Sequence, residues 1–192
     1  MLFLLIKNLF ANPYQPQNGD IIFHTSLSRQ SAAIQIATES PYSHVGIVYI
    51  KNNKPYVFEA ISTVSSTPLN TWISRGEGQR YMVMRTKKEL SQEQLTSMKQ
   101  EGDSHLGKKY DVKFEWGDEK MYCSELVWKV YEAADIKLSA PHKMKSYNFE
   151  DPRVLKELQD RWHQNINWNE SVVAPVDLVK SKKLTVVFNS EE

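Results

Sequence analysis

The chain has 192 residues, of which 41% are hydrophobic and 11% aromatic. This length suits one domain, and a globule of this size buries about 70% of its unfolded surface, so a packed core is expected. A formal net charge of +1 excludes the strongly basic surface that is typical of nucleic-acid-binding proteins. The only cysteine, Cys123, excludes an internal disulfide framework and a multi-thiolate metal site.

Residues 1–18 form a lead-in to the predicted domain, which spans 19–192. Residues 1–11 begin with a short apolar run that a lysine interrupts, so they fit either the end of a cleaved leader or a short docked helix. No segment reaches the roughly 18 apolar residues of a membrane span. One thiol is compatible with both oxidising and reducing compartments, so the location stays open.

The first half of the predicted domain alternates strands with short helices. Ser26 or Ser28 can cap the first helix, and an Asn-Asn-Lys turn at residues 52–54 joins two strands as a hairpin. In chain order we predict a strand over 20–24, a helix over 28–39, strands over 43–50 and 55–60, a short helix over 69–74 and a strand over 80–85.

The second half is mainly helical. Ser91 opens a helix with a capping box, and the helix over 122–134 has the best amphipathic pattern. In chain order we predict a helix over 91–102, a loop over 107–117, a helix over 122–134, a loop over 139–148, helices over 152–162 and 174–180, and a strand over 184–188. Grouped strands with helices on either side indicate an α+β fold with an antiparallel sheet.

Cys123 stands in the first turn of the predicted helix 122–134. Free backbone N–H groups and the helix dipole favour negative charge there, which lowers the pKa of a thiol toward the reactive thiolate. This position suits a nucleophile. The alternative is a small buried apolar residue, which is the commoner fate of a lone cysteine.

A thiol nucleophile needs a base and a third group that orients the base. His44 begins a β-rich run, and Glu59 lies in an apolar strand, where a carboxylate is costly to bury unless it is paired. If these strands form a hairpin, Glu59 can accept a hydrogen bond from the imidazole of His44. The alternatives are an ordinary polar histidine and a strand-end carboxylate, and His142 in a polar loop is a second candidate base.

Several other residues are weaker candidates. Tyr110 and Tyr122 can supply a second oxyanion donor or a pocket wall, or simply pack beside the helix. Asp20 can support the site or merely begin a strand, and residues 161–168 can line a pocket or pack two tryptophans. Two serines, Ser31 and Ser124, lack the Gly-x-Ser-x-Gly elbow of a serine nucleophile. The five histidines show no metal-ligand spacing, so no metal or other cofactor is predicted.

Five short runs in this order resemble one family. They are Gly19–Phe23, Ser43–Val48, Phe58–Ala60, Gly107–Asp111 and Tyr122–Val127. Together they are similar to the circularly permuted papain-like amidases of the YaeF/YiiX group, within the NlpC-type cysteine peptidases. The resemblance implies a six-stranded or similar antiparallel sheet packed against the helix that carries the cysteine.

The resemblance also implies Cys123 as nucleophile, His44 as general base and Glu59 as the orienting residue. The reaction it implies is cleavage of a peptide-like or lipid-like amide through a thioester. Two alternatives stay open, an acyltransferase of the lecithin–retinol acyltransferase-like type and a non-catalytic binding module on the same fold. Location in the bacterial periplasm or envelope is usual for the family, but the start of this chain lacks a clear secretion signal. The oligomeric state cannot be read from the sequence.

Overall fold

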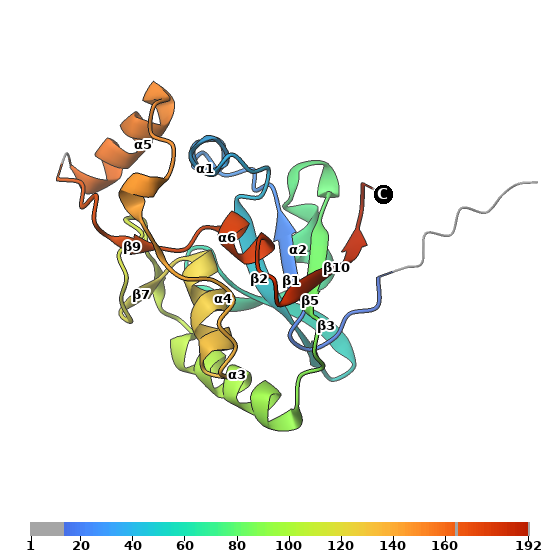
Figure 1. Ribbon diagram of the computed structural model, residues 1–192. Coiled ribbons are helices and arrows are strands. Elements are labelled where there is room, and N and C mark those ends of the chain that lie inside the picture. Colours follow the sequence, from blue (N-terminus) through green and yellow to red (C-terminus); the bar gives the residue numbers. More distant parts are fainter. Residues whose placement is uncertain (1–13, 164, 192) are drawn as a thin grey trace, which may run out of the picture.

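The computed structural model describes residues 14–163 and 165–191. At its centre lies a six-stranded sheet in the order β10-β5-β1-β2-β3-β4, in which every neighbouring pair is antiparallel (Figure 1). Its strands are β1 (Ile21–His24), β2 (His44–Lys51), β3 (Lys54–Ala60), β4 (Val64–Pro68), β5 (Met82–Thr86) and β10 (Leu184–Asn189). The predicted α+β fold with an antiparallel sheet is confirmed.

The predicted hairpin is formed by β2 and β3, in which Lys51 pairs with Lys54. The two residues between them, Asn52 and Asn53, both have positive φ angles, of 50° and 58°. Asparagine tolerates this left-handed conformation better than most residues, and a tight two-residue turn requires it. The local sequence therefore fixes the register that places the start of β2 beside the end of β3.

The described residues form six α-helices in addition to the sheet. They are α1 (Ser31–Thr38), α2 (Leu69–Ser74), α3 (Gln92–His105), α4 (Cys123–Glu132), α5 (Pro152–Trp162) and α6 (Pro175–Val179). The predicted capping box of α3 is confirmed, since Ser91 accepts from the backbone of Gln94 and the Gln94 side chain accepts from Ser91. The predicted serine cap of α1 is wrong: its N-cap is Gln30, because Ser26 and Ser28 instead form a turn ahead of the helix.

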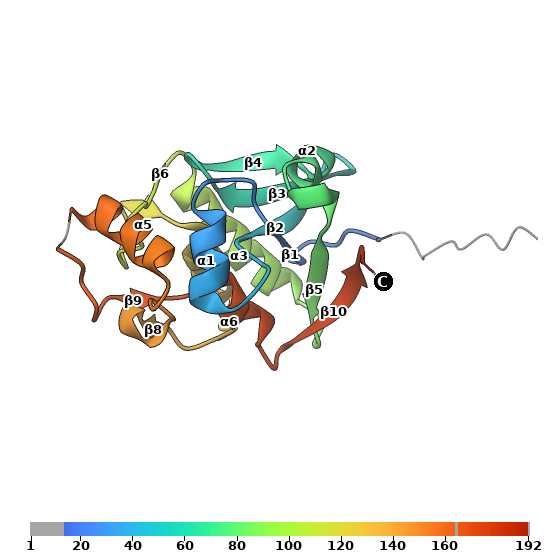
Figure 2. The same ribbon diagram turned by 90° about the horizontal axis from the view of Figure 1, so that it is seen from above.

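The two faces of the sheet carry separate cores, as the alternation of side chains along a strand requires. On one face, Phe23, Val45 and Ile47 belong to the main cluster, together with Leu126 and Val127 of α4. A smaller cluster on the other face contains Ile22, Val48, Val57 and Val83, and Trp72 of α2 packs with it. Away from the sheet, α1 and α5 lie side by side (Figure 2). The start of α4 thus lies near both the sheet and this helix pair.

The strand β4 was not predicted; it lies between the predicted strand over 55–60 and the predicted helix over 69–74. Its sequence is polar, ends in proline and lies at one edge of the sheet, where apolar alternation is not needed. The connections between these elements, including the predicted loops over 107–117 and 139–148, contain two-residue strands and single turns of helix. These are η1 (Glu77–Gln79), β6 (Lys109–Tyr110), β7 (Lys120–Met121), β8 (His142–Lys143), η2 (Met144–Ser146) and β9 (Ser171–Val172).

None of the helices in the described part of the chain is long and apolar enough to cross a membrane. The expectation of a leader end or docked helix over residues 1–11 lies outside the described residues.

Candidate active site

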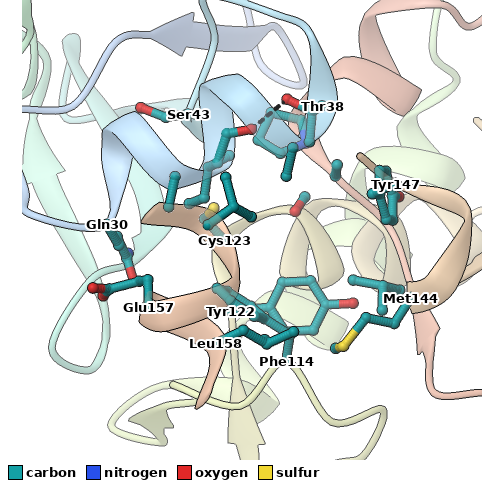
Figure 3. Close-up of a pocket in the computed structure, with 18 of the residues that line it drawn as sticks. Gln30, Thr38, Ser43, Phe114, Tyr122, Cys123, Met144, Tyr147, Glu157 and Leu158 are labelled. Atoms are coloured by element: carbon teal, nitrogen blue, oxygen red, sulfur yellow. Dashed lines mark hydrogen bonds between the residues drawn. The ribbon is translucent and has the colours of Figure 1, made fainter. Parts of the chain in front are cut away.

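Cys123 is the first residue of α4 and is almost completely buried. Tyr122, which precedes it, has extended backbone angles and no side-chain cap, so the first backbone N–H groups of the helix have no side-chain acceptor from the N-cap. The sulfur of Cys123 faces a cavity, where the close-up shows it between the surrounding side chains (Figure 3). The start of α4 therefore presents both a thiol and free N–H donors at one place.

His44 is the first residue of β2, and its ring is buried beside Cys123. Its Nε2 lies 2.7 Å from Oε2 of Glu59, which leaves Nδ1 for the hydrogen bond with the Cys123 side chain. Burial by itself would lower the pKa of His44, but the hydrogen bonds to Cys123 and Glu59 outweigh burial and raise it to about 9. The imidazole can therefore hold a proton at neutral pH in spite of its burial.

Glu59 is fully buried on β3, and each of its oxygens has a partner. Oε2 faces His44, while Oε1 accepts from Thr67 at 2.6 Å and from the guanidinium of Arg75. Burial alone would raise the pKa of Glu59, but the hydrogen bonds from His44, Thr67 and Arg75 lower it to about 2. The carboxylate is therefore ionised and is held in one orientation.

Sequence reasoning did not identify Thr67 or Arg75. The apolar neighbours of Glu59 signalled that its charge needed a partner. However, 24 lysines and arginines were available, and the local sequence does not say which of them reaches the strand. Arg75 directly follows α2, and Thr67 lies on β4, the strand that was not predicted.

The two candidate tyrosines both line the cavity but in different ways. Tyr122 is fully buried, its hydroxyl accepts from the backbone N–H of Val173 at 3.2 Å, and its ring packs edge-on against Phe114. The hydroxyl of Tyr110 accepts from the side chain of Gln30 at 3.2 Å, and burial raises its pKa, so the hydroxyl keeps its proton. Both hydroxyls act as acceptors in these contacts, but Tyr122 is fully buried whereas Tyr110 is half-buried, so Tyr110 is the more accessible of the two.

The remaining histidine and acidic candidates lie elsewhere. His142 is half-exposed, and its Nε2 lies 3.8 Å from Oδ1 of Asp177. Asp20 is buried against Arg85, with Nε–Oδ1 2.6 Å and Nη2–Oδ2 2.9 Å, and it also accepts from Tyr14. The polar partners of His44 are instead Cys123 and Glu59.

The other sequence candidates have packing roles. In the segment 161–168, Arg161 lines the cavity, while Trp162 is buried and donates to the backbone of Lys113. The hydroxyl of Ser31 bonds to that of Ser43 at 2.6 Å, and Ser124 donates to the backbone of Val173 at 2.6 Å. Neither serine is paired with a histidine.

The cavity in front of Cys123 has a volume of about 720 Å³ including its open mouth. Figure 3 shows Gln30 and Glu157 on one side of the cysteine and Met144 and Tyr147 on the other. Its lining is almost entirely apolar and includes Ala33, Ile34, Ala37, Val154, Leu158 and Val173. The charged lining side chains Glu157 and Arg161 form an ion pair of 2.7 Å with each other. The cavity thus suits an uncharged, apolar group beside the thiol.

The sequence profile of the permuted papain-like amidases, described as the YaeF/YiiX or C92 family, matches residues 15–188. The chain belongs to this family. Its fold is therefore the circularly permuted papain-like fold, and the general class of reaction that the family supports is amide hydrolysis.

Two relatives of this amidase family member are close. The chain is 43% identical over 188 residues to the uncharacterized protein YiiX of Escherichia coli K12, covering 97% of this chain and 93% of that protein. It also resembles a crystal structure from Escherichia coli O157:H7 described as metalloprotein YiiX, with 45% identity and a TM-score of 0.89. That match covers 92% of this chain and 98% of the solved one.

The description of that solved relative raises the question of a metal in this family member. Within residues 14–163 and 165–191, no three His, Cys, Asp or Glu side chains come together in a way that could hold a metal ion. The residues described here therefore do not fit a metal centre, and no step of the chemistry below uses one.

Proposed function

We propose that this protein is a cysteine hydrolase that cleaves an amide bond, with Cys123 as nucleophile, His44 as general base and Glu59 as the residue that orients the base. The observation that carries the proposal is the buried chain of hydrogen bonds from Cys123 through His44 to Glu59. A nucleophile, a base and an oriented third group in contact are the defining geometry of such sites. The proposed catalytic unit is the domain 19–192, with 1–18 as its lead-in.

In the proposed acylation step, Nδ1 of His44 takes the thiol proton and the sulfur of Cys123 attacks the carbonyl carbon of the amide. The C–N bond then breaks, the imidazolium gives its proton to the leaving nitrogen, and an amine departs. A thioester remains on Cys123. In the second step, His44 takes a proton from water, the hydroxide attacks the thioester, and the thiol is regenerated with release of the carboxylic acid.

The negative oxygen of each tetrahedral intermediate needs donors that are already in place. The backbone N–H of Cys123 at the start of α4 is one proposed donor, and the helix dipole supports it. The hydroxyl of Tyr110 is the proposed second donor, because it lines the same cavity and its proton is not used by Gln30. Tyr122 is proposed only as part of the cavity wall.

The apolar lining of the cavity indicates which kind of substrate it can bind. An apolar cavity beside the thiol favours an amide whose carbonyl side carries an apolar group, whether a peptide-like side chain or an acyl chain. A charged group there would lose its hydration without a charged partner, since Glu157 and Arg161 neutralise each other.

The test is to trap the acyl-enzyme. The protein is mixed with N-acyl p-nitroanilides of increasing acyl size, and released nitroaniline and intact protein mass are measured together. The wild type should release nitroaniline and gain the mass of the acyl group on the only cysteine, and the Cys123→Ala variant should do neither. Nitroaniline release that persists in Cys123→Ala would overturn the proposal.

Adding alcohol or lipid acceptors to the same reaction separates hydrolysis from acyl transfer. Hydrolysis yields the free carboxylic acid at every acceptor concentration. An acylated acceptor as the main product would replace the hydrolase with an acyltransferase, and a protein that shows neither product nor adduct would be a binding module.

A further inference from the structure

A second buried histidine lies directly beside the proposed base. His24 is the last residue of β1, and the antiparallel register pairs it with His44, so both side chains project from the same face of the sheet at the same end. Their ring centroids are 5.2 Å apart, with a tilt of 34°. His24 is only 2% exposed, so its ring is enclosed by neighbouring side chains.

Trp72 of α2 packs against the rings of both His24 and His44. The rings of His24 and Trp72 are stacked with centroids 3.9 Å apart and an angle of 16°, and the same indole also lies 5.8 Å from the ring of His44. Gly76 also lies close to the His24 ring, so that a Cβ at that position would lie 2.7 Å from Nδ1 of His24. The His24 ring therefore fills a tightly bounded space beside α2 and His44.

The charged groups around the two imidazoles give them different protonation states. Burial, together with the charge of the nearby His44, lowers the pKa of His24 to about 3, while Glu59 opposes this and Arg75 adds a smaller lowering. The groups that face His44 are Cys123 from α4, Glu59 from β3 and His24 from β1, with Arg75 beyond Glu59. Only His44 has an anion on its ring nitrogen, so it takes the proton and His24 stays neutral.

We propose that His24 is a positioning residue for His44: its ring, stacked on Trp72 and packed beside His44, fixes the His44 imidazole so that Nε2 stays on Glu59 and Nδ1 stays on Cys123. This inference rests on the proposed function. Residues at the end of a β-strand have fewer neighbours than residues in its middle, so the His44 ring would otherwise be held less firmly. Here the packing of His24 and Trp72 supplies the missing support.

The test compares His24→Ala with His24→Phe. The first removes the ring, and the second keeps a flat ring with no ionisable nitrogen. Because Cys123 is the only cysteine, the rate of alkylation by iodoacetamide at a series of pH values reports the ionisation of the Cys123–His44 pair. Steady-state hydrolysis of an N-acyl p-nitroanilide is measured beside it.

In the plot of alkylation rate against pH, one midpoint reports the pKa of His44. We expect His24→Ala to shift this midpoint toward the ordinary pKa of histidine by about one pH unit or more. Its kcat should fall at least about tenfold with KM unchanged, because the base is misplaced and the cavity is intact. His24→Phe should restore the wild-type profile and a kcat within about threefold of wild type.

Gly76→Ala provides a second variant that leaves the histidine in place. Its new Cβ pushes on His24 and should shift the profile in the same direction as His24→Ala. Gly117→Ala is the matched control, because a Cβ at Gly117 meets nothing within 4 Å and should leave the profile unchanged.

Two outcomes would overturn the positioning role. They are an unchanged profile in His24→Ala, and a loss in His24→Phe as large as that in His24→Ala. A wild-type profile that does not differ from that of His44→Ala would instead refute the proposed function itself.

Discussion

The guanidinium of Arg75 binds Glu59 on Oε1, the oxygen that His44 does not use. One buried carboxylate thereby joins β2, β3 and the residue that ends α2. Charge pairs of this kind do not always stabilise a protein relative to apolar residues, but removing one partner is costly because it leaves the other uncompensated. Arg75 is thus expected to act on both the stability and the chemistry of the site.

Replacing Arg75 tests this relationship. Arg75→Met should lower the free energy of unfolding by about 2 kcal/mol, less than the 3–5 kcal/mol of a fully buried pair, because the Arg75 side chain is 35% exposed. The pKa of Glu59 should rise at the same time. Urea unfolding and the acid side of the activity profile measure the two effects. Arg75→Lys keeps the charge and is the control, and equal losses in both variants would contradict the charge argument.

Glu59→Gln removes the charge but keeps the shape of the side chain. Without the carboxylate, the pKa of His44 should fall, since one of the hydrogen bonds that raises it is weakened. We expect a loss of kcat of about 10²-fold or more, because an amide orients the ring but does not stabilise the imidazolium. Nitroaniline release measures the loss, and turnover within threefold of wild type would exclude Glu59 as the orienting residue.

Stability should vary with pH in a defined way. His44 has a higher pKa in the folded protein, about 9 against 6.5, so its contribution is complete below pH 6.5 and is lost as the pH rises through about 9. Glu59 has a lower pKa, about 2 against 4.5, so its contribution is complete above pH 4.5 and is lost as the pH falls through about 2. Both contributions are therefore complete between pH 4.5 and 6.5.

Urea unfolding of the wild type and of His44→Asn at pH 5.5, 8 and 10 isolates the alkaline part of this dependence. The difference in stability between the two proteins should shrink as the pH rises. A difference that stays constant over this range would mean that the raised pKa of His44 does not contribute to folding.

Asp20 should matter for folding and not for catalysis. It is fully buried and binds Arg85 through both of its oxygens, so Asp20→Asn should lower the free energy of unfolding by about 2–3 kcal/mol. Asp20 binds Arg85, Tyr14 and Gln17, which do not belong to the Cys123–His44–Glu59 chain. The pH profile of Cys123 alkylation should therefore not change. A shifted profile in the folded variant would reinstate Asp20 as a supporting residue of the site.

The cavity can be filled without touching the catalytic groups. Ala33 faces it from α1, and Ala33→Trp should raise KM for large acyl groups by about tenfold while iodoacetamide still reaches Cys123 at the wild-type rate. Ala32→Trp is the matched control, since Ala32 is exposed on the same helix and does not line the cavity. Equal effects of the two substitutions would show that the substrate lies elsewhere.

Local sequence determined much of the fold. The Asn52–Asn53 turn set the β2–β3 hairpin, the amphipathic run after Tyr122 set α4, and the Ser91 capping box set the start of α3. These features depend on backbone propensity and apolar spacing, which act between residues near in the chain. The edge strand β4 was not predicted, because its polar sequence lacks the apolar alternation that indicates a strand.

The sequence by itself also offered Cys123, His44 and Glu59 as candidates, from a thiol at a helix start, a histidine at a strand start and a carboxylate in an apolar strand, and the resemblance to one family joined them as a triad. Only the tertiary structure decided what surrounds them. Arg75 and Thr67 reach Glu59, and His24 and Trp72 pack around His44, through contacts between strands and helices that lie apart in the chain. Such contacts depend on how the elements are packed in three dimensions, and the pKa values of His44 and Glu59 follow from that packing.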